Sequence, residues 1–188
     1  MTAAEPAIWF VLGLSGAGKS SLGAALAAAT RWLHLEMDQW REDAGDGLAL
    51  HGLSSGWDDL KAGRGAQALV GALRRLIALE GAAGAVLTFP SSRVLGPRHI
   101  NALWPDVRVI YLTGEPRLCL AAFLERERAS GRGLPAASWH YYNKHLLRAL
   151  RAPQLRPYQV DAFLPDGRRK PMAALLKELD VSPKVVAG

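Results

Sequence analysis

The sequence predicts an α/β fold in which a five-stranded parallel sheet is covered by helices on both faces. Short apolar segments alternate along the chain with longer segments of helical periodicity, as in strand–helix–strand units. The first apolar segment leads directly into a glycine-rich loop and then into an alanine-rich helix. Neither a repeat nor a linker divides the 188 residues, so we expect one domain over residues 1–180 and a flexible tail over 181–188.

Five segments have the composition of buried strands. The first contains no polar residue, as expected of a parallel strand that is buried on both faces. The third is stopped by Pro90, which cannot continue a central strand. The expected strands are Ile8–Leu12, Trp32–Met37, Ala85–Phe89, Val107–Leu112 and Tyr158–Phe163.

Most of the remaining sequence has helical signals. Ala66–Glu80 carries a stripe of leucine and isoleucine, and Gly81 ends it. Pro116 stands in the first turn of another helix, where proline is tolerated. The expected helices are Ser20–Ala29, Ala66–Glu80, Pro97–Leu103, Pro116–Ala129, Ala137–Leu150 and Pro171–Leu179. We expect residues 39–65 to be irregular, because they contain glycines, acidic residues and tryptophans without a clear period.

Charge and cysteine content restrict the classes of partner. The net charge is +6, and the arginines stand singly or in pairs, which suits a protein that handles polyphosphates and disfavours nucleic acid as a partner. The single cysteine, Cys119, excludes an intramolecular disulfide. No apolar stretch approaches the roughly 20 residues that cross a bilayer. We therefore expect a cytoplasmic protein without a membrane partner, as a monomer or a homodimer.

The loop after the first strand has the strongest functional signal. Gly13–Ser20 reads GLSGAGKS and matches the pattern G-x-x-x-x-G-K-[ST] in full. Glycines let the backbone curl so that its N–H groups and the following helix N-terminus face phosphate oxygens. In this motif Lys19 bridges the β- and γ-phosphates, and the Ser20 hydroxyl ligates magnesium. The sequence predicts a nucleoside triphosphate and Mg²⁺ as cofactors, bound by Gly13, Ser15, Gly16, Ala17, Gly18, Lys19, Ser20 and Ser21.

Other motifs separate the classes of nucleotide-binding protein. A GTPase needs Asn-Lys-x-Asp, but the nearest match, Asn143–Leu146, lacks the aspartate. A remodelling ATPase usually carries an aspartate after a hydrophobic strand, whereas Pro90–Ser92 follows the third strand here. A small kinase is the remaining class.

A kinase needs a carboxylate near the acceptor hydroxyl. Asp38 follows the second strand, at the edge where open α/β sheets bind ligands, and is a candidate general base or holder of a magnesium-bound water. The alternative role of Asp38 is to cap a following helix. Arg41 lies three residues later and could reach an anionic part of the acceptor or stand in solvent.

A kinase also needs cations over the transferred phosphoryl group. Arg126, Arg128 and Arg132 leave a helix and enter a loop flanked by glycines, which predicts a lid over residues 126–137. We expect Arg128 and Arg132 to act in catalysis and Arg126 to contact the nucleotide. The alternative is an ordinary charged helix face.

These motifs resemble the nucleoside-monophosphate-kinase-like group of P-loop kinases, which includes gluconate kinase and shikimate kinase. The loop Gly13–Ser20 is most similar to that of adenylylsulfate kinase, and Asp38–Arg41 is similar to the Asp-x-x-Arg of that enzyme and of polynucleotide kinases. The overall layout resembles chloramphenicol phosphotransferase, with Ala17–Ser21 in the loop, Trp32 after the first helix, Asp38 after the second strand and a late arginine-rich lid.

The resemblance implies a three-layer P-loop NTPase fold with strand order 2-3-1-4-5. It also implies that Asp38 deprotonates the acceptor, and that residues 39–65 and 90–98 form the acceptor pocket. Trp57 and Arg93 are the candidate acceptor contacts in those segments, together with Asp38 and Arg41.

The predicted function is transfer of the γ-phosphoryl group of ATP to a hydroxyl of a small molecule, either antibiotic-like or a metabolite. The predicted catalytic residues are Asp38, Lys19, Arg128 and Arg132. Two alternatives remain open: a nucleotide, polynucleotide or adenylylsulfate-type kinase, and a regulator that binds ATP without transferring phosphate.

Overall fold

A computed structural model describes residues 7–37 and 47–181 of the chain. Its sheet consists of five parallel strands in the order β2-β3-β1-β4-β5, which confirms the predicted fold and strand order. Their bounds are β1 Ala7–Gly13, β2 Leu33–Glu36, β3 Gly84–Thr88, β4 Val107–Thr113 and β5 Gln159–Asp161. The sheet has the central strand β1 between β3 and β4, so the strand that precedes the glycine-rich loop is the most deeply enclosed.

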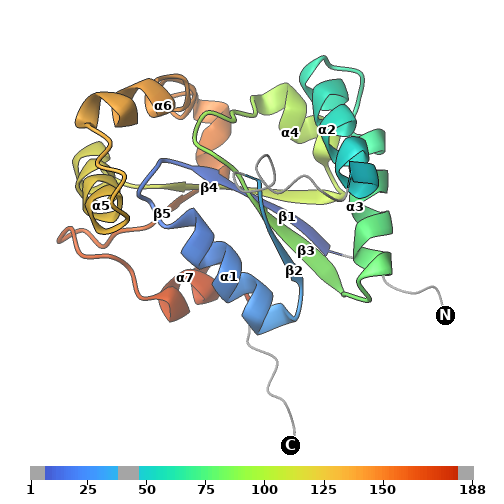
Figure 1. Ribbon diagram of the computed structural model, residues 1–188, viewed down its shortest axis with the longest axis horizontal. Coiled ribbons are helices and arrows are strands. Elements are labelled where there is room, and N and C mark those ends of the chain that lie inside the picture. The colour runs from blue at the N-terminus through green and yellow to red at the C-terminus, as the bar shows by residue number, and fades with distance from the viewer. Residues whose placement is uncertain (1–6, 38–46, 182–188) are drawn as a thin grey trace, which may run out of the picture.

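Helices cover both faces of this sheet (Figure 1). Helices α1 and α7 lie on one face, and α2, α3 and α4 lie on the other. Helices α5 and α6 lie beyond the carboxyl end of β1, beside the loop that joins it to α1. The bounds are α1 Lys19–Thr30, α2 Gly47–Lys61, α3 Gln67–Leu79, α4 Pro97–Leu103, α5 Pro116–Ala129, α6 Ala136–Ala149, the 3₁₀ helix η2 Pro153–Tyr158, and α7 Met172–Glu178.

The expectation of an irregular segment over residues 39–65 is wrong for its second half, because helix α2 occupies Gly47–Lys61. Leu53, Trp57 and Leu60 recur at helical spacing and are all buried, so an apolar stripe does exist. Gly56 lies within that helix because a Cβ there would come within 2.5 Å of the Leu69 backbone nitrogen on α3. The glycine that resembles a helix breaker in the sequence permits close packing of two helices.

The loop after β3 is anchored to the central strands by one buried tyrosine. The Tyr111 hydroxyl on β4 donates to the Leu95 carbonyl at 2.5 Å and accepts from the Leu95 amide at 2.9 Å. Burial raises the pKa of Tyr111 to about 12, so the hydroxyl stays protonated and keeps both bonds over the whole neutral range. The segment between β3 and α4 is therefore held in place beside the carboxyl edge of the sheet.

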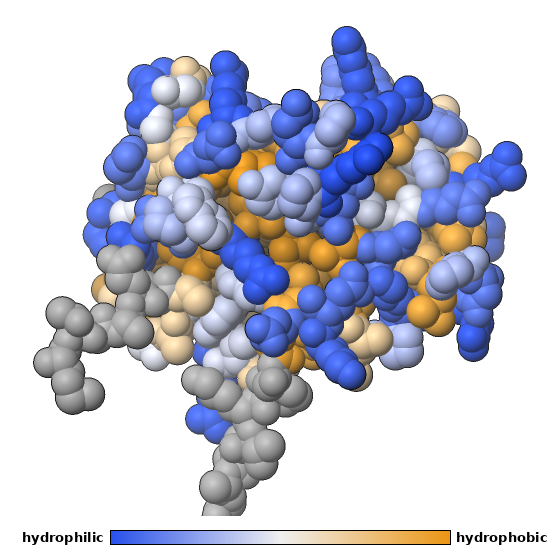
Figure 2. Space-filling view, turned by 180° about the vertical axis from the view of Figure 1, so that it is seen from behind, coloured by the Kyte–Doolittle hydropathy of each residue, from blue (hydrophilic) through white to orange (hydrophobic). Residues whose placement is uncertain are grey.

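The surface is mixed in character. Figure 2 shows hydrophilic side chains spread over the rear face, with apolar patches between them near its centre. Over residues 7–37 and 47–181, none of the helices is both long enough and apolar enough to span a lipid bilayer.

Candidate active site

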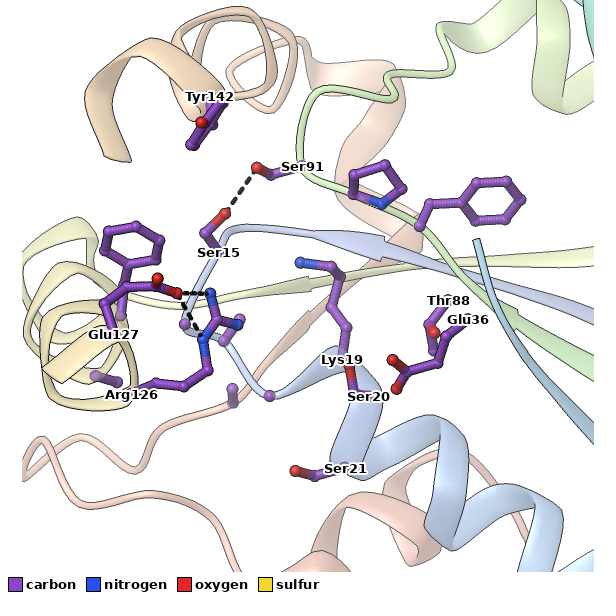
Figure 3. Close-up of a pocket in the computed structure, with 18 of the residues that line it drawn as sticks. Ser15, Lys19, Ser20, Ser21, Glu36, Thr88, Ser91, Arg126, Glu127 and Tyr142 are labelled. Atoms are coloured by element: carbon purple, nitrogen blue, oxygen red, sulfur yellow. Dashed lines mark hydrogen bonds and ion pairs between the residues drawn. The ribbon is translucent and has the colours of Figure 1, made fainter. Parts of the chain in front are cut away.

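A cavity of about 670 Å³ lies at the carboxyl edge of the sheet (Figure 3). Its walls come from the loop between β1 and α1, the end of β2, residues 88–92 at and after the end of β3, the C-terminal half of α5 with the segment that follows it, α6, and the segment from β5 into α7. Most of the predicted phosphate-binding residues, Ser15–Ser21, line it. A concave site of this size with few convergent polar groups suits a small ligand.

The loop itself has the backbone conformation that its glycines permit. Gly16 and Gly18 have φ of 86° and 96°, which side chains with a Cβ rarely adopt. A Cβ on Gly16 would also collide with the carbonyl oxygen of Cys119, so α5 lies directly against the loop. Helix α1 begins at Lys19, and the N–H groups of its first turn and its positive dipole end therefore belong to the cavity wall.

Lys19 and Ser20 supply the motif's two side chains. The Lys19 ammonium donates to the Leu14 carbonyl at 3.1 Å, which lays the side chain along the loop and keeps its charge at the cavity. Ser20 lines the same wall. The loop therefore offers the ammonium, the hydroxyl and the helix N-terminus that the sequence motif predicts.

Glu36, the last residue of β2, is a site residue that the sequence analysis missed. It pairs in register with Thr88 on β3, and both residues line the cavity with Lys19 and Ser20. Figure 3 shows the Glu36 carboxylate turned toward the side of Lys19 and Ser20. The sequence did contain a signal for Glu36. It is an acidic residue at the end of a parallel strand, and it stands two positions before Asp38.

The environment of Glu36 is partly enclosed. Its side chain is 25% exposed and lies 3.9 Å from His34 Nε2. Burial lowers the pKa of His34, and the neighbouring Glu36 opposes that shift. The hydroxyl of Ser20 and a carboxylate at Glu36 are hard oxygen donors of the kind that Mg²⁺ prefers, so these residues fit a magnesium ion carried with a nucleotide.

At the end of α5, one buried carboxylate holds two arginines. Glu127 Oε1 accepts from Arg126 Nη2 at 2.8 Å and from Arg132 Nη2 at 3.0 Å. All three residues line the cavity. The predicted lid segment thus brings two guanidinium groups to the cavity that the phosphate loop lines.

Arg128 lies exposed on the same helix and is not among the described residues that line the cavity. Its predicted catalytic role therefore remains a prediction without geometric support.

An arginine that contacts the phosphate loop was also missed from the sequence. Arg169, in the segment between β5 and α7, donates to the carbonyls of Gly16 at 2.6 Å and Ala17 at 3.3 Å. Its guanidinium lies 5.3 Å from the Phe163 ring centroid. This arginine joins the C-terminal part of the chain to the outer side of the phosphate loop.

The predicted acceptor contacts have different positions. Trp57 is buried against Phe89, with ring centroids 4.8 Å apart, and the Arg93 guanidinium lies 5.6 Å from the Trp57 centroid. Of this stack only Phe89 belongs to the described cavity lining. Asp38 and Arg41 lie outside the described residues. Contact of any of the four predicted residues with an acceptor stays a prediction.

No family model and no curated protein matches this sequence. Solved structures do match. A sugar kinase from Janibacter sp. HTCC2649 has a TM-score of 0.54 and 18% sequence identity, covering 97% of this chain and 99% of the kinase. A gluconokinase from Sinorhizobium meliloti 1021 has a TM-score of 0.50 and 18% identity, covering 94% and 90% of the two chains. A shikimate kinase from Acinetobacter baumannii, in complex with shikimate, has a TM-score of 0.50 and 18% identity, with 96% of each chain covered.

At this level of identity the likeness establishes the fold. The chain has the P-loop NTPase fold, and the three solved structures named above are those of a sugar kinase, a gluconokinase and a shikimate kinase. The finer resemblances to chloramphenicol phosphotransferase and adenylylsulfate kinase remain predictions from the sequence.

Proposed function

We propose that this protein is an ATP-dependent phosphotransferase that phosphorylates a hydroxyl group of a small molecule. One observation carries the proposal: a phosphate-binding loop with its lysine and serine faces a carboxylate, Glu36, and two lid arginines across a single cavity. Phosphoryl transfer depends on this combination of positioning and charge stabilisation.

The nucleotide's phosphates fit the loop side of the cavity. Backbone N–H groups of the loop and of the first turn of α1 would bind the β-phosphate, and Lys19 would bridge the β- and γ-phosphates. Ser20 and Glu36 would hold a magnesium ion, whose charge would neutralise part of the charge of the phosphates. Arg126 and Arg132 would bind the transferred phosphoryl group from the opposite side.

The reaction proposed is an in-line displacement. The acceptor oxygen forms a new bond to the γ-phosphorus, and the bond from that phosphorus to the β–γ bridging oxygen breaks. ADP leaves with the bonding electron pair. The proton of the acceptor hydroxyl goes to the carboxylate of Asp38, which follows the last residue of β2 by two positions in the sequence.

The acceptor side supports a small, hydroxylated substrate. Ser91, Ser92 and Tyr142 supply hydroxyl groups to the lining, and Phe89, Pro90 and Leu134 supply apolar surface. The solved sugar kinase and shikimate kinase, whose fold this chain shares, are named for acceptors of that general kind. We therefore propose a hydroxylated metabolite, or a hydroxyl-bearing antibiotic, as the acceptor class.

An acceptor screen tests the proposal. ADP release and the mass of each product should be measured with sugars, hydroxylated carboxylic acids and hydroxyl-bearing antibiotics, using wild type, Glu36→Gln and Asp38→Ala. Glu80→Gln, an exposed carboxylate at the end of α3, is the matched control. We expect one acceptor class to gain a phosphoryl group in step with ADP release, and both site variants to slow the transfer by about 100-fold or more.

Two results would contradict the proposal. ADP release at the same rate with every compound and no phosphorylated product would indicate an ATPase. Nucleotide binding without turnover across the screen would favour the regulator.

A further inference from the structure

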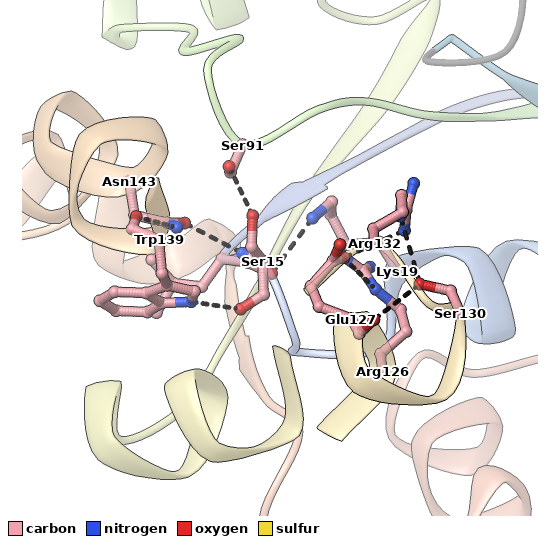
Figure 4. A network of polar contacts seen from close by, with 10 residues as sticks. Ser15, Lys19, Ser91, Arg126, Glu127, Ser130, Arg132, Trp139 and Asn143 are labelled. Atoms are coloured by element: carbon pink, nitrogen blue, oxygen red, sulfur yellow. Dashed lines mark hydrogen bonds and ion pairs between the residues drawn. The ribbon is translucent and has the colours of Figure 1, made fainter. Parts of the chain in front are cut away.

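Helix α6 holds the phosphate loop through a buried hydrogen-bond network (Figure 4). The Ser15 amide donates to Asn143 Oδ1 at 2.9 Å, and the Trp139 indole N–H donates to the Ser15 carbonyl at 2.8 Å. Asn143 Nδ2 donates to the Trp139 carbonyl at 2.7 Å, which orients the Asn143 amide. Trp139 is 1% exposed and Asn143 is fully buried.

The arrangement satisfies both backbone polar groups of one residue, Ser15. Trp139 and Asn143 are four residues apart, so they lie one above the other on the same face of α6. One supplies a donor and the other an acceptor to the N–H and C=O of the same residue, as a neighbouring strand would. Buried polar groups require such partners, and leaving a buried amide unpaired is destabilising.

Ser15 is also held by its side chain. Its hydroxyl lies 2.7 Å from the hydroxyl of Ser91, a buried residue in the segment after β3. The backbone of Ser15 is thus bound to α6, and its side chain is bound to the acceptor side of the cavity. The residue directly precedes Gly16, where the loop adopts its left-handed conformation.

We propose that Asn143 and Trp139 are positioning residues that hold the phosphate loop in its anion-binding conformation. By binding the backbone of Ser15 they fix the backbone conformation that leads into Gly16 and Gly18. That conformation sets the direction of the N–H groups that follow. The inference rests on the proposed function, and it assigns to α6 a role in phosphate affinity that no local sequence motif indicates.

A tryptophan and an asparagine at the centre of a packed helix could equally serve stability alone. The two roles differ in what they change. A residue that only stabilises the fold alters the unfolding temperature and leaves the ratio of phosphate affinity to nucleoside affinity unchanged. A residue that orients the loop alters the affinity for the phosphates and spares the nucleoside.

The test is calorimetric titration of the full chain with three probes: inorganic tripolyphosphate, Mg²⁺-ADP and adenosine. Asn143→Ala removes both side-chain bonds, and Trp139→Phe keeps an aromatic ring while removing the N–H donor. Lys144→Ala, an exposed residue on the same helix, is the matched control. Folding of each variant is checked by thermal unfolding.

We expect Asn143→Ala to weaken tripolyphosphate and Mg²⁺-ADP by about tenfold, since one buried hydrogen bond to the loop is lost. Trp139→Phe should weaken the same two probes by a smaller factor, and adenosine affinity should not change in either variant. The inference is overturned if both variants bind the phosphate probes as tightly as Lys144→Ala does, or if they lose adenosine affinity in the same proportion. Wild-type protein that binds none of the phosphate probes would instead overturn the proposed function, and this inference with it.

Discussion

Helices α6 and α5 both border the phosphate loop, but they contact this region of the molecule in opposite ways. The α6 contact is neutral and buried, and each of its polar atoms has a partner. The end of α5 instead presents a charged cluster to the same cavity: Glu127 is 2% exposed, whereas the Arg126 and Arg132 side chains are 55% and 60% exposed. Among the described residues, Glu127 Oε2 has no hydrogen-bond partner.

The difference indicates two functions for the two helices. An incoming phosphate does not compete for the neutral, buried hydrogen bonds between α6 and Ser15, so these bonds would hold the loop in one conformation. Both guanidiniums of these ion pairs lie mostly in solvent, so they are accessible to a phosphate that competes with Glu127 for them. We therefore expect α6 to keep the cradle fixed and the end of α5 to supply cations that rearrange when the nucleotide binds.

The largest expected effect comes from removing the Lys19 ammonium at the cavity wall. Lys19→Ala should lower the rate of phosphoryl transfer by about 10²–10³-fold, because a preorganised charge at the transferred phosphate is lost. The measurement is kcat for ADP release, with Lys177→Ala on the exposed surface of α7 as the control. Equal rates in the two variants would remove Lys19 from the mechanism.

The lid arginines give the next effect. Arg132→Ala should lower kcat/KM by about tenfold or more, since the guanidinium at the cavity wall is lost. Arg128→Ala should have a smaller effect, because that side chain is exposed outside the described lining. Steady-state kinetics of the two variants side by side decide between them. A larger loss in Arg128→Ala would support the role predicted for it from the sequence.

Neutralising Glu127 should act in the opposite direction to the loss of Asn143. Glu127→Gln removes a negative charge from the cavity wall and frees two arginines, so Mg²⁺-ADP should bind about fivefold more tightly. The gain should shrink as salt is raised. Titration at low and high ionic strength measures both effects. Weaker binding at every salt concentration would show that Glu127 orients the arginines and does not compete for them.

The smallest effect concerns the buried part of α5. Burial raises the pKa of Cys119 to about 11 from its ordinary 9.0, so the thiol should resist alkylation in the native protein at pH 8. In the unfolded chain the thiol ionises at lower pH. The Cys119 contribution to the free energy of unfolding should therefore fall as pH rises from about 9 to about 11.

Thiol labelling and denaturant unfolding over that pH range, with Cys119→Ala for comparison, test this expectation. Rapid labelling of native protein would show that α5 opens from the loop at Cys119 and would contradict this expectation.

The sequence predicted the fold closely where local signals agree. The helices at Pro97–Leu103 and Pro116–Ala129 have the predicted bounds, because proline marks their first turns. Helix α2 was missed because glycines such as Gly56 are unfavourable inside a helix. Gly56 is needed there for close contact with α3, which the local sequence does not show. The last strand is shorter than predicted, since β5 pairs only with β4 at the edge of the sheet.

The candidate site likewise combines residues that a local motif predicts with residues that only the fold brings together. The loop over Gly13–Ser20 is a local motif, so its lysine, serine and glycines could be assigned without the fold. Glu36 joins the site through its register with Thr88 on another strand. Asn143 bonds a residue 128 positions away, which no spacing rule reveals.

The most direct test of the account is a crystal structure with Mg²⁺-ADP bound. We expect the β-phosphate to lie within the loop, with the Lys19 ammonium in hydrogen-bond contact, the ion between the phosphate and the side of Ser20 and Glu36, and the Ser15–Asn143 bond intact. A nucleotide bound away from Gly13–Ser20, or a loop that leaves α6 to receive it, would contradict the account.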